Sequence, residues 1–82
     1  MEKTVIEKIG NKISKKYGMP KVIVTRKRNG EHGYMGYEIR TELPSYEGGS
    51  ELQESIYQYY AKKFISVIVE NLGGCIYFAY TP

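Results

Sequence analysis

Asn29-Gly30 separates two stretches of the chain in which apolar and polar side chains alternate. Asn-Gly is the strongest short signal for a two-residue hairpin, because a type I′ turn requires positive φ at both central positions. The pattern therefore predicts strands over residues 21–28 and 31–42, paired so that Val24 lies opposite Met35. A hairpin in this position constrains the remaining elements to pack around it.

Alternation sorts the side chains of the two strands onto two faces. The face expected to point at the core is almost entirely apolar: Val22, Val24, Met35, Tyr37, Ile39 and Leu43. The opposite face is mixed: Lys21, Ile23, Thr25, Lys27, His32, Tyr34, Glu38 and Arg40. Because only one face is suited to burial, we expect helices to cover one side of the sheet.

The chain on each side of the hairpin favours a helix. Thr4-Val-Ile-Glu7 has the spacing of a capping box, and Gly18 followed by Pro20 is a stop signal, which predicts a helix over residues 4–17. A second capping box, Ser50-Glu-Leu-Gln53, follows a loop over residues 43–49. It opens a helix expected to reach about Leu72, because apolar residues recur at helical spacing: Leu52, Ile56, Tyr60, Phe64, Val67 and Ile68.

Gly73-Gly74 is expected to end the second helix, and residues 75–80 to form a third strand. The predicted fold is α+β, with order α-β-β-α-β: a three-stranded, mostly antiparallel sheet in two layers, both helices packed on one face. We expect the third strand beside the first, antiparallel to it, with Ile76, Phe78 and Tyr80 in the core and Cys75, Tyr77 and Ala79 on the mixed face. At 82 residues, the chain is expected to form a single domain over residues 1–82.

Composition narrows the class of protein. The apolar fraction of 41% is too high for a disordered chain. The first residues lack the apolar segment of a signal peptide, and no apolar run approaches the roughly 20 residues that cross a bilayer. The only cysteine, Cys75, excludes an internal disulfide. We therefore expect a cytoplasmic protein with no membrane partner.

Positive charge is concentrated in the first half of the chain. Residues 1–40 have a net charge of +6 and residues 41–82 a net charge of −3. The cations nearest the predicted hairpin are candidates for contact with nucleic acid or an acidic partner: Arg26, Lys27, Arg28, His32 and Arg40. The alternative is a hairpin end kept soluble by its charge, with Glu31 partly neutralising Arg28. Lysines on the first helix are interpreted as a solvated face.

Tyrosines supply a second set of candidate contacts. Tyr34 and Tyr77 are expected on the mixed face among the cations, where rings stack on bases in nucleic-acid-binding proteins. Residues 32–39 do not fit the RNP1 pattern of RNA-recognition motifs. The alternative is a face that is half-buried or covered by a second copy of the chain.

Nine tyrosines are also more than a core of this size can hold, and tyrosine is enriched at protein interfaces. Tyr59, beside the inward-facing Tyr60, is therefore a candidate for an interface with another protein. The alternative is that these rings pack locally and keep their hydroxyls in water.

The sequence contains few residues that could support catalysis or bind a metal ion. Cys75 would need His32 as its base, yet the predicted topology separates them, and one histidine with one cysteine does not make a metal site. We expect no enzyme activity, no cofactor and no small-molecule substrate. The expected function is a small binding protein that docks on nucleic acid or a nucleoprotein complex through the hairpin and the tyrosine-bearing face. The alternative is a protein-targeting inhibitor or adaptor, of the kind that mobile elements and phages use, which acts through Tyr and Arg hot spots. A homodimer is a further alternative for its assembly.

Overall fold

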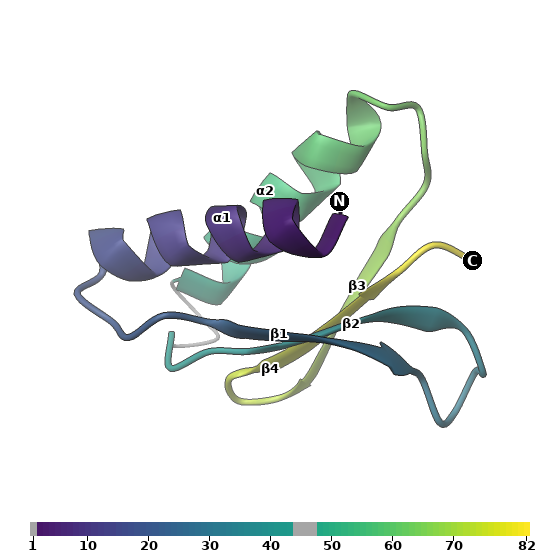
Figure 1. The fold of residues 1–82 in the computed structure, drawn as a ribbon, viewed down its shortest axis with the longest axis horizontal. Coiled ribbons are helices and arrows are strands. Elements are labelled where there is room, and N and C mark those ends of the chain that lie inside the picture. Colours follow the sequence, from purple (N-terminus) through teal and green to yellow (C-terminus); the bar gives the residue numbers. More distant parts are fainter. Residues whose placement is uncertain (1, 44–47) are drawn as a thin grey trace.

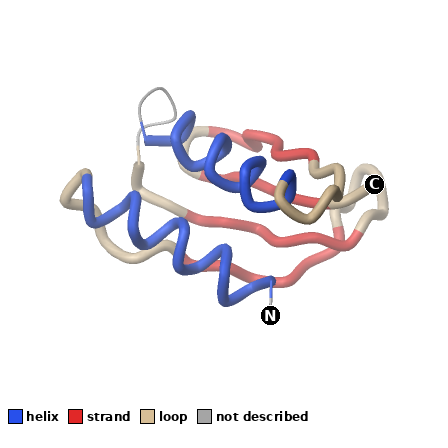
Figure 2. Tube along the Cα trace, turned by 90° about the horizontal axis from the view of Figure 1, so that it is seen from above, coloured by secondary structure: helices blue, strands red, loops and turns tan. Residues whose placement is uncertain are grey.

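The structure is a computed structural model that describes residues 2–43 and 48–82. Its elements, in chain order, are α1 (Glu2–Lys16), β1 (Ile23–Arg28), β2 (Met35–Arg40), α2 (Gly48–Ala61), β3 (Ile68–Gly73) and β4 (Ile76–Tyr80). The strands form one antiparallel sheet in the order β1-β2-β4-β3. Both helices lie on one face of this sheet, as Figure 1 shows from the side and Figure 2 from above.

The expected α+β class, with two helices on one face of the sheet, is confirmed, whereas the expected three strands are four. The last strand does not lie beside β1 as expected, but between β2 and β3. The expected loop over residues 43–49 falls mostly on residues 44–47, outside the described residues, and α2 already begins at Gly48.

Helix α1 begins two residues before Thr4, so the expected capping box lies inside the helix and does not start it. Its apolar side packs on the sheet, with Ile6 and Ile13 buried. The expected stop is confirmed: α1 ends at Lys16, and Gly18 adopts the left-handed conformation with φ of 69°.

The segment before β1 is fixed to α1 at two neighbouring positions. A Cβ placed on Gly10 would lie 2.6 Å from Cγ2 of Val22, so a larger residue there would force the valine or the helix to shift. One residue further along the helix, the Oδ1 atom of Asn11 accepts a hydrogen bond of 2.9 Å from the backbone N–H of Val22. The helix therefore holds the start of β1 at a close, defined distance.

Helix α2 ends at Ala61, well before the expected end at Leu72. The N–H of Ile65 bonds the carbonyl of Tyr60 and the N–H of Phe64 bonds the carbonyl of Ala61, which is the bonding pattern of a Schellman cap. Phe64 occupies the position that glycine usually takes, with φ of 55° and its ring 98% exposed. The apolar pattern continued past Ala61, but the helix did not.

The residues expected to complete that helix form β3 instead. Residues 65–69 are rich in β-branched side chains, which lose rotamer freedom in a helix and pack well in a sheet. Gly73 and Gly74, both with positive φ, then form the turn of a β3–β4 hairpin. A helical reading of residues 62–72 was wrong because apolar spacing alone does not distinguish a short buried strand from a helix.

The β1–β2 register differs from the expected one by four residues. Val24 lies opposite Ile39, not opposite Met35. Because four is an even number, the assignment of side chains to the two faces survives the shift. Met35 is the exception among the expected core residues of the two hairpin strands, since it lies at the end of β2 and is 38% exposed.

The cause of the shift is a loop where a two-residue turn was expected at Asn29-Gly30. The N–H of Asn29 bonds the carbonyl of Tyr34 at 2.8 Å, which closes a longer connection. Inside it, the Asn29 side chain accepts hydrogen bonds from the N–H groups of Glu31 and His32, and the positive φ of 74° belongs to Gly33. Asparagine therefore organises the loop through its side chain.

The faces of β4 are the reverse of the expected ones. Tyr77 lies opposite Ile39 and Ala79 follows on the same side, so these two residues belong to the core beneath the helices. Phe78 and Tyr80 lie on the other face and are nevertheless buried. Because β4 lies between β2 and β3, neighbouring side chains bury its residues on the open side as well, so a run of five apolar residues did not show which side meets the helices.

The main core lies between the helices and the sheet, built from Ile6, Ile13, Val22, Val24, Tyr37, Ile39, Leu43, Leu52, Ile56, Tyr60, Val69, Tyr77 and Ala79. Within the described residues, neither helix has the length and apolar character needed to span a membrane.

Candidate interaction surface on the open sheet face

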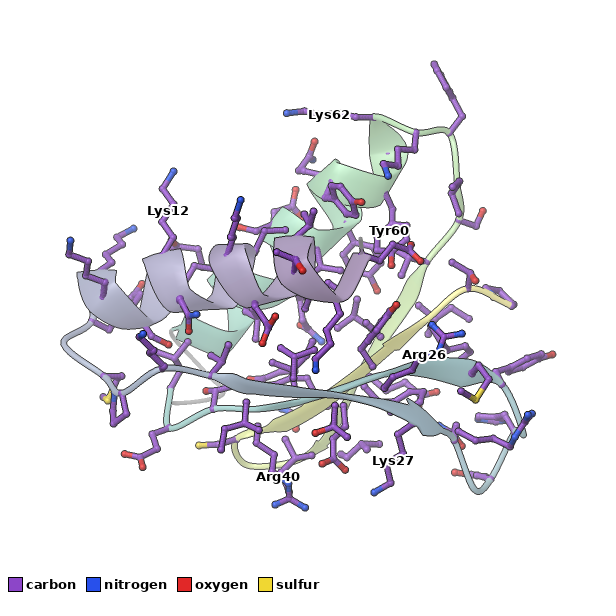
Figure 3. All side chains as sticks on the ribbon, viewed as in Figure 1. Lys12, Arg26, Lys27, Arg40, Tyr60 and Lys62 are labelled. Atoms are coloured by element: carbon purple, nitrogen blue, oxygen red, sulfur yellow. The ribbon has the colours of Figure 1, made fainter. Side chains whose placement is uncertain are left out.

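The sheet face turned away from the helices carries alternate residues of all four strands. We call it the open face. Its described members, from the strand registers, are Ile23, Thr25, Lys27, Gly36, Glu38, Arg40, Ile68, Glu70, Ile76, Phe78 and Tyr80. Figure 3 shows Lys27 and Arg40 projecting from this face, away from the helices.

Glu38 is the electrostatic centre of the open face. Its side chain is only 10% exposed, with Lys27 Nζ 3.0 Å from Oε2 and Arg40 Nε 2.8 Å from Oε1. The hydrogen bond from Lys27, supported by that from Arg40, holds the pKa of the Glu38 carboxyl below its ordinary value of 4.5. One buried carboxylate therefore neutralises part of the charge of two cations that the sequence suggested were free for a partner.

An aromatic group lies where the β1–β2 loop meets β4. The rings of Tyr34 and Tyr80 stack with centroids 5.3 Å apart and an interplanar angle of 13°, and His32 lies 6.1 Å from Tyr80. The Tyr80 hydroxyl donates to Glu70 at 2.9 Å, and His32 Nε2 lies 3.6 Å from the same carboxylate oxygen. Burial, followed by the bond to Glu70, raises the pKa of Tyr80. Tyr34 presents the most exposed ring of this group.

A shallow hollow of about 220 Å³ opens between the β1–β2 loop and β3, lined by Lys27, Arg28, Asn29, Gly30, Glu31, Glu38, Leu72 and Phe78. Exposed apolar side chains stand around the open face: Ile23 is 62% exposed, Leu72 is 51% exposed, and Ile68 is also exposed. The face therefore combines paired charges with apolar side chains in contact with water.

The other expected cations lie apart from this arrangement. Arg26 points to the helix side of the sheet (Figure 3), where its guanidinium donates to the Tyr37 hydroxyl at 3.0 Å and sits 5.5 Å from that ring. Arg28 donates to the carbonyl of Gly33 at 2.6 Å, inside the β1–β2 loop. The expected basic group is thus divided between two faces and a loop.

Two of the three expected tyrosines are not on the open face. Tyr77 is 1% exposed and lies in the core, so its expected place on the mixed face is wrong, and burial raises the pKa of its hydroxyl. Tyr59 lies on α2, in the helix layer, edge-on to Tyr60 and with Lys63 Nζ 4.7 Å from its ring centre. Tyr34 stands beside the open face as expected, and Tyr59 stands on the second helix beside Tyr60, also as expected.

Sequence reasoning did not single out several members of this surface. Glu70 and Leu72 were assigned to a helix, and Tyr80 to the core. Gly73-Gly74 after a β-branched run is a hairpin signal that could have identified β3 and hence Glu70. The side of β4 that carries Tyr80 had no comparable signal.

A larger hollow, of about 720 Å³, lies between the two helices, lined by Ile9, Lys12, Ile13, Lys15, Lys16, Glu51 and Ser55. Its lysines are exposed, and Lys16 is bridged to Glu51 at 2.8 Å. Their hydrogen bond raises the pKa of Lys16 and lowers that of Glu51. Exposed and bridged lysines of this kind are typical of a solvated helix face.

The groups considered for chemistry are separated. His32 is adjacent to Tyr80 at the end of β4, whereas Cys75 precedes the start of that strand and donates its thiol to the carbonyl of Leu43 at 3.1 Å. Among the residues that the structure describes, no three His, Cys, Asp or Glu side chains are grouped so that they could hold a metal ion.

No protein-family model, no curated protein and no solved structure matches this chain. Its function is therefore argued from the geometry of the open face.

Proposed function

We propose that the protein is a non-catalytic binding protein whose open face docks on another protein, as an inhibitor or adaptor would. The observation that carries this proposal is the pairing of Lys27 and Arg40 with the nearly buried Glu38. A surface for nucleic acid presents cations to phosphates, whereas a protein interface combines satisfied polar groups with apolar contacts. Ile23 and Leu72 supply such contacts.

A partner that complements this surface would carry an apolar patch surrounded by charged side chains of both signs. Burial of the exposed side chains of Ile23 and Leu72 would contribute affinity by removing apolar surface from water. The exposed Tyr34 ring, held by stacking on Tyr80, offers a rigid contact with little entropy left to lose. The proposal includes a cytoplasmic location, which a single cysteine supports.

The test is affinity capture from host extract with the wild type and with Leu72→Glu. A specific protein should be retained by the wild type at moderate salt and lost with Leu72→Glu. Lys12→Gln, which lowers the charge by the same single unit on α1, is the matched control and should retain it. Recovery of nucleic acid alone, or equal recovery with all three proteins, would show that the open face is not a protein-docking surface.

A second candidate function, binding of single-stranded nucleic acid, is favoured by one feature of the β1–β2 loop. Arg28 bonds the carbonyl of Gly33, the residue before the exposed Tyr34, so a cation and an available ring are adjacent there. Stacking on such a ring beside a phosphate contact is how many proteins hold single strands.

This candidate predicts retention of a short DNA or RNA strand in a mobility-shift titration at low salt, with affinity that falls steeply as salt rises. Tyr34→Ala and Arg28→Ala should each weaken binding. Absence of any shift at high micromolar protein would rule it out.

A further inference from the structure

The two outer strands of the sheet, β1 and β3, differ in how far other groups of the chain cover their free edges. At β3, the outward N–H of Val69 donates to the hydroxyl of Tyr57 at 3.3 Å, and its carbonyl accepts from Nε2 of Gln53 at 3.2 Å. Two side chains of α2 thus take the place of a neighbouring strand. An edge covered in this way is protected from pairing with another chain.

Two backbone hydrogen bonds show which residues of β1 pair with β2. The N–H of Thr41 bonds the carbonyl of Cys75, on the β4 side of the strand. Because successive residues of a strand direct their backbone groups to opposite sides, the odd-numbered residues of β2 bond β4 and its even-numbered residues bond β1. The N–H of Asn29, just after β1, bonds the carbonyl of Tyr34, just before β2. This bond also indicates that the odd-numbered residues of β1 face β2. The residues of β1 that bond β2 are therefore Ile23, Thr25 and Lys27.

Val24, Arg26 and Arg28 consequently direct their backbone N–H and carbonyl groups away from the sheet. The previous outward residue, Val22, has its N–H bonded by Asn11, so α1 covers the edge only at its start. Within residues 2–43 and 48–82, no other element bonds the outward backbone groups of these three residues. Val24 is only 4% exposed, whereas Thr25 to Arg28 are all exposed, so the accessible part of this edge runs from Thr25 to Arg28.

The side chains along this edge are β-branched in its first half and cationic in its second. Arg26 contacts the uncharged Tyr37 and Arg28 a backbone carbonyl, so neither arginine has an ion-pair partner among the described residues. Lys27 alone is paired, with Glu38. The edge therefore combines unpaired backbone groups with uncompensated positive charge.

We propose that the outer edge of β1 accepts an extended acidic segment of another protein as a fifth strand of the sheet. Backbone pairing with the outward groups of Arg26 and Arg28 would hold the segment, as in other cases of strand addition. Its carboxylates would lie beside Arg26 and Arg28, and a β-branched residue beside Thr25. The same cations oppose pairing with a second copy of β1, because like charges across neighbouring strands destabilise the pair. This inference concerns the backbone edge and is independent of the partner of the open face.

A labelled peptide tests the proposal with the intact protein. Its core is three glutamates followed by a threonine, a valine and an isoleucine, the order that pairs antiparallel with β1, and binding is followed by fluorescence anisotropy. Two further peptides carry N-methyl groups on alternate residues: one on the residues whose N–H groups would point at β1, the other on the residues whose N–H groups would point away from it. Only the phase whose N–H groups point at β1 should lose affinity, by about tenfold or more, since each lost backbone bond contributes roughly 1 kcal/mol.

Charge and position are tested separately. Replacing the glutamates of the peptide with lysines should abolish binding, and Arg28→Glu should weaken it about tenfold while Lys12→Glu does not. Leu72→Glu, which alters the open face, should leave peptide affinity unchanged, so this proposal and the proposed function can fail independently.

Three results would overturn the strand-addition proposal. The first is equal loss of affinity with both N-methyl phases, and the second is equal competition by an oligonucleotide of the same charge, which would indicate electrostatic attraction alone. The third is a dimer in solution, detected by light scattering, in which the outer edge of β1 is already paired with the second copy of the chain.

Discussion

Gly10 of α1 and Val22 before β1 approach so closely that a Cβ on Gly10 would lie 2.6 Å from Cγ2 of Val22. Glycine inside a helix ordinarily costs about 1 kcal/mol relative to alanine. Here that cost is offset by the close packing of helix on chain, since the stiff valine side chain leaves no room for a methyl group.

Gly10→Ala is therefore expected to destabilise the protein by about 1–3 kcal/mol, in spite of the better helix propensity of alanine. Chemical denaturation measures the change. In a protein that already carries Val22→Ala, adding Gly10→Ala should cost much less stability than it does in the wild type, because the clashing Val22 methyl groups are gone. A stabilised Gly10→Ala protein would mean that the helix stands further from Val22.

Phe64 provides the opposite case, a bulky residue with φ of 55° and almost no contact with the rest of the chain. Phe64→Gly is expected to raise the free energy of unfolding by about 0.5–1 kcal/mol, since glycine adopts this conformation without strain. Phe64→Ala keeps the strain and should leave stability nearly unchanged. Thermal unfolding distinguishes the two, and a loss of stability in both variants would indicate that the ring packs against the protein.

Glu38 should make stability depend on pH in acid. Its pKa is lowered in the folded protein, so its contribution is present above the ordinary value of 4.5 and is lost as pH falls through the folded value. Glu38→Gln should cost about 1 kcal/mol at neutral pH, because both cationic partners are more than half exposed and screened by water. The difference between wild type and variant should close in acid. Glu54→Gln, at an exposed site on α2, is the control and should show little change at any pH.

Tyr57 is expected to protect the β3 edge through its hydroxyl. Tyr57→Phe removes the acceptor of the Val69 N–H and should lower stability by about 1 kcal/mol. Amide hydrogen exchange gives the sharper readout: the Val69 amide should exchange faster in the variant. Tyr34→Phe, whose hydroxyl has no bond to the described part of the chain, is the matched control. Unchanged exchange at Val69 would mean that the edge is covered by another group.

The parts of the fold that sequence predicted depend on strong local signals. Gly18 stopped α1 where expected, and alternation over residues 22–43 assigned most side chains to the right face even though the register was wrong. The register failed because the Asn29 side chain organises a longer loop, a local hydrogen-bond arrangement that Asn-Gly does not specify. The fourth strand was missed because an apolar spacing of three and four continued from α2 into β3.

The candidate surface was less predictable than the fold. Which face of β4 meets the helices depends on its position inside the sheet, so Tyr77 and Tyr80 exchanged places relative to expectation. The pairing of Glu38 with Lys27 and Arg40 depends on three-dimensional neighbours of a kind that charge counting does not show. Tyr34 was placed correctly because the alternation of β2 extends to it, one residue before the strand begins at Met35.

The strand made last along this chain, β4, occupies an interior position in the sheet, between β2 and β3. During translation, β2 and β3 therefore have no shared neighbour until residues 76–80 have left the ribosome. Until then the edges of β2 and β3 that later bond β4 are unpaired, so a chain that stopped before residue 76 would leave β3 with no strand to pair with in this sheet.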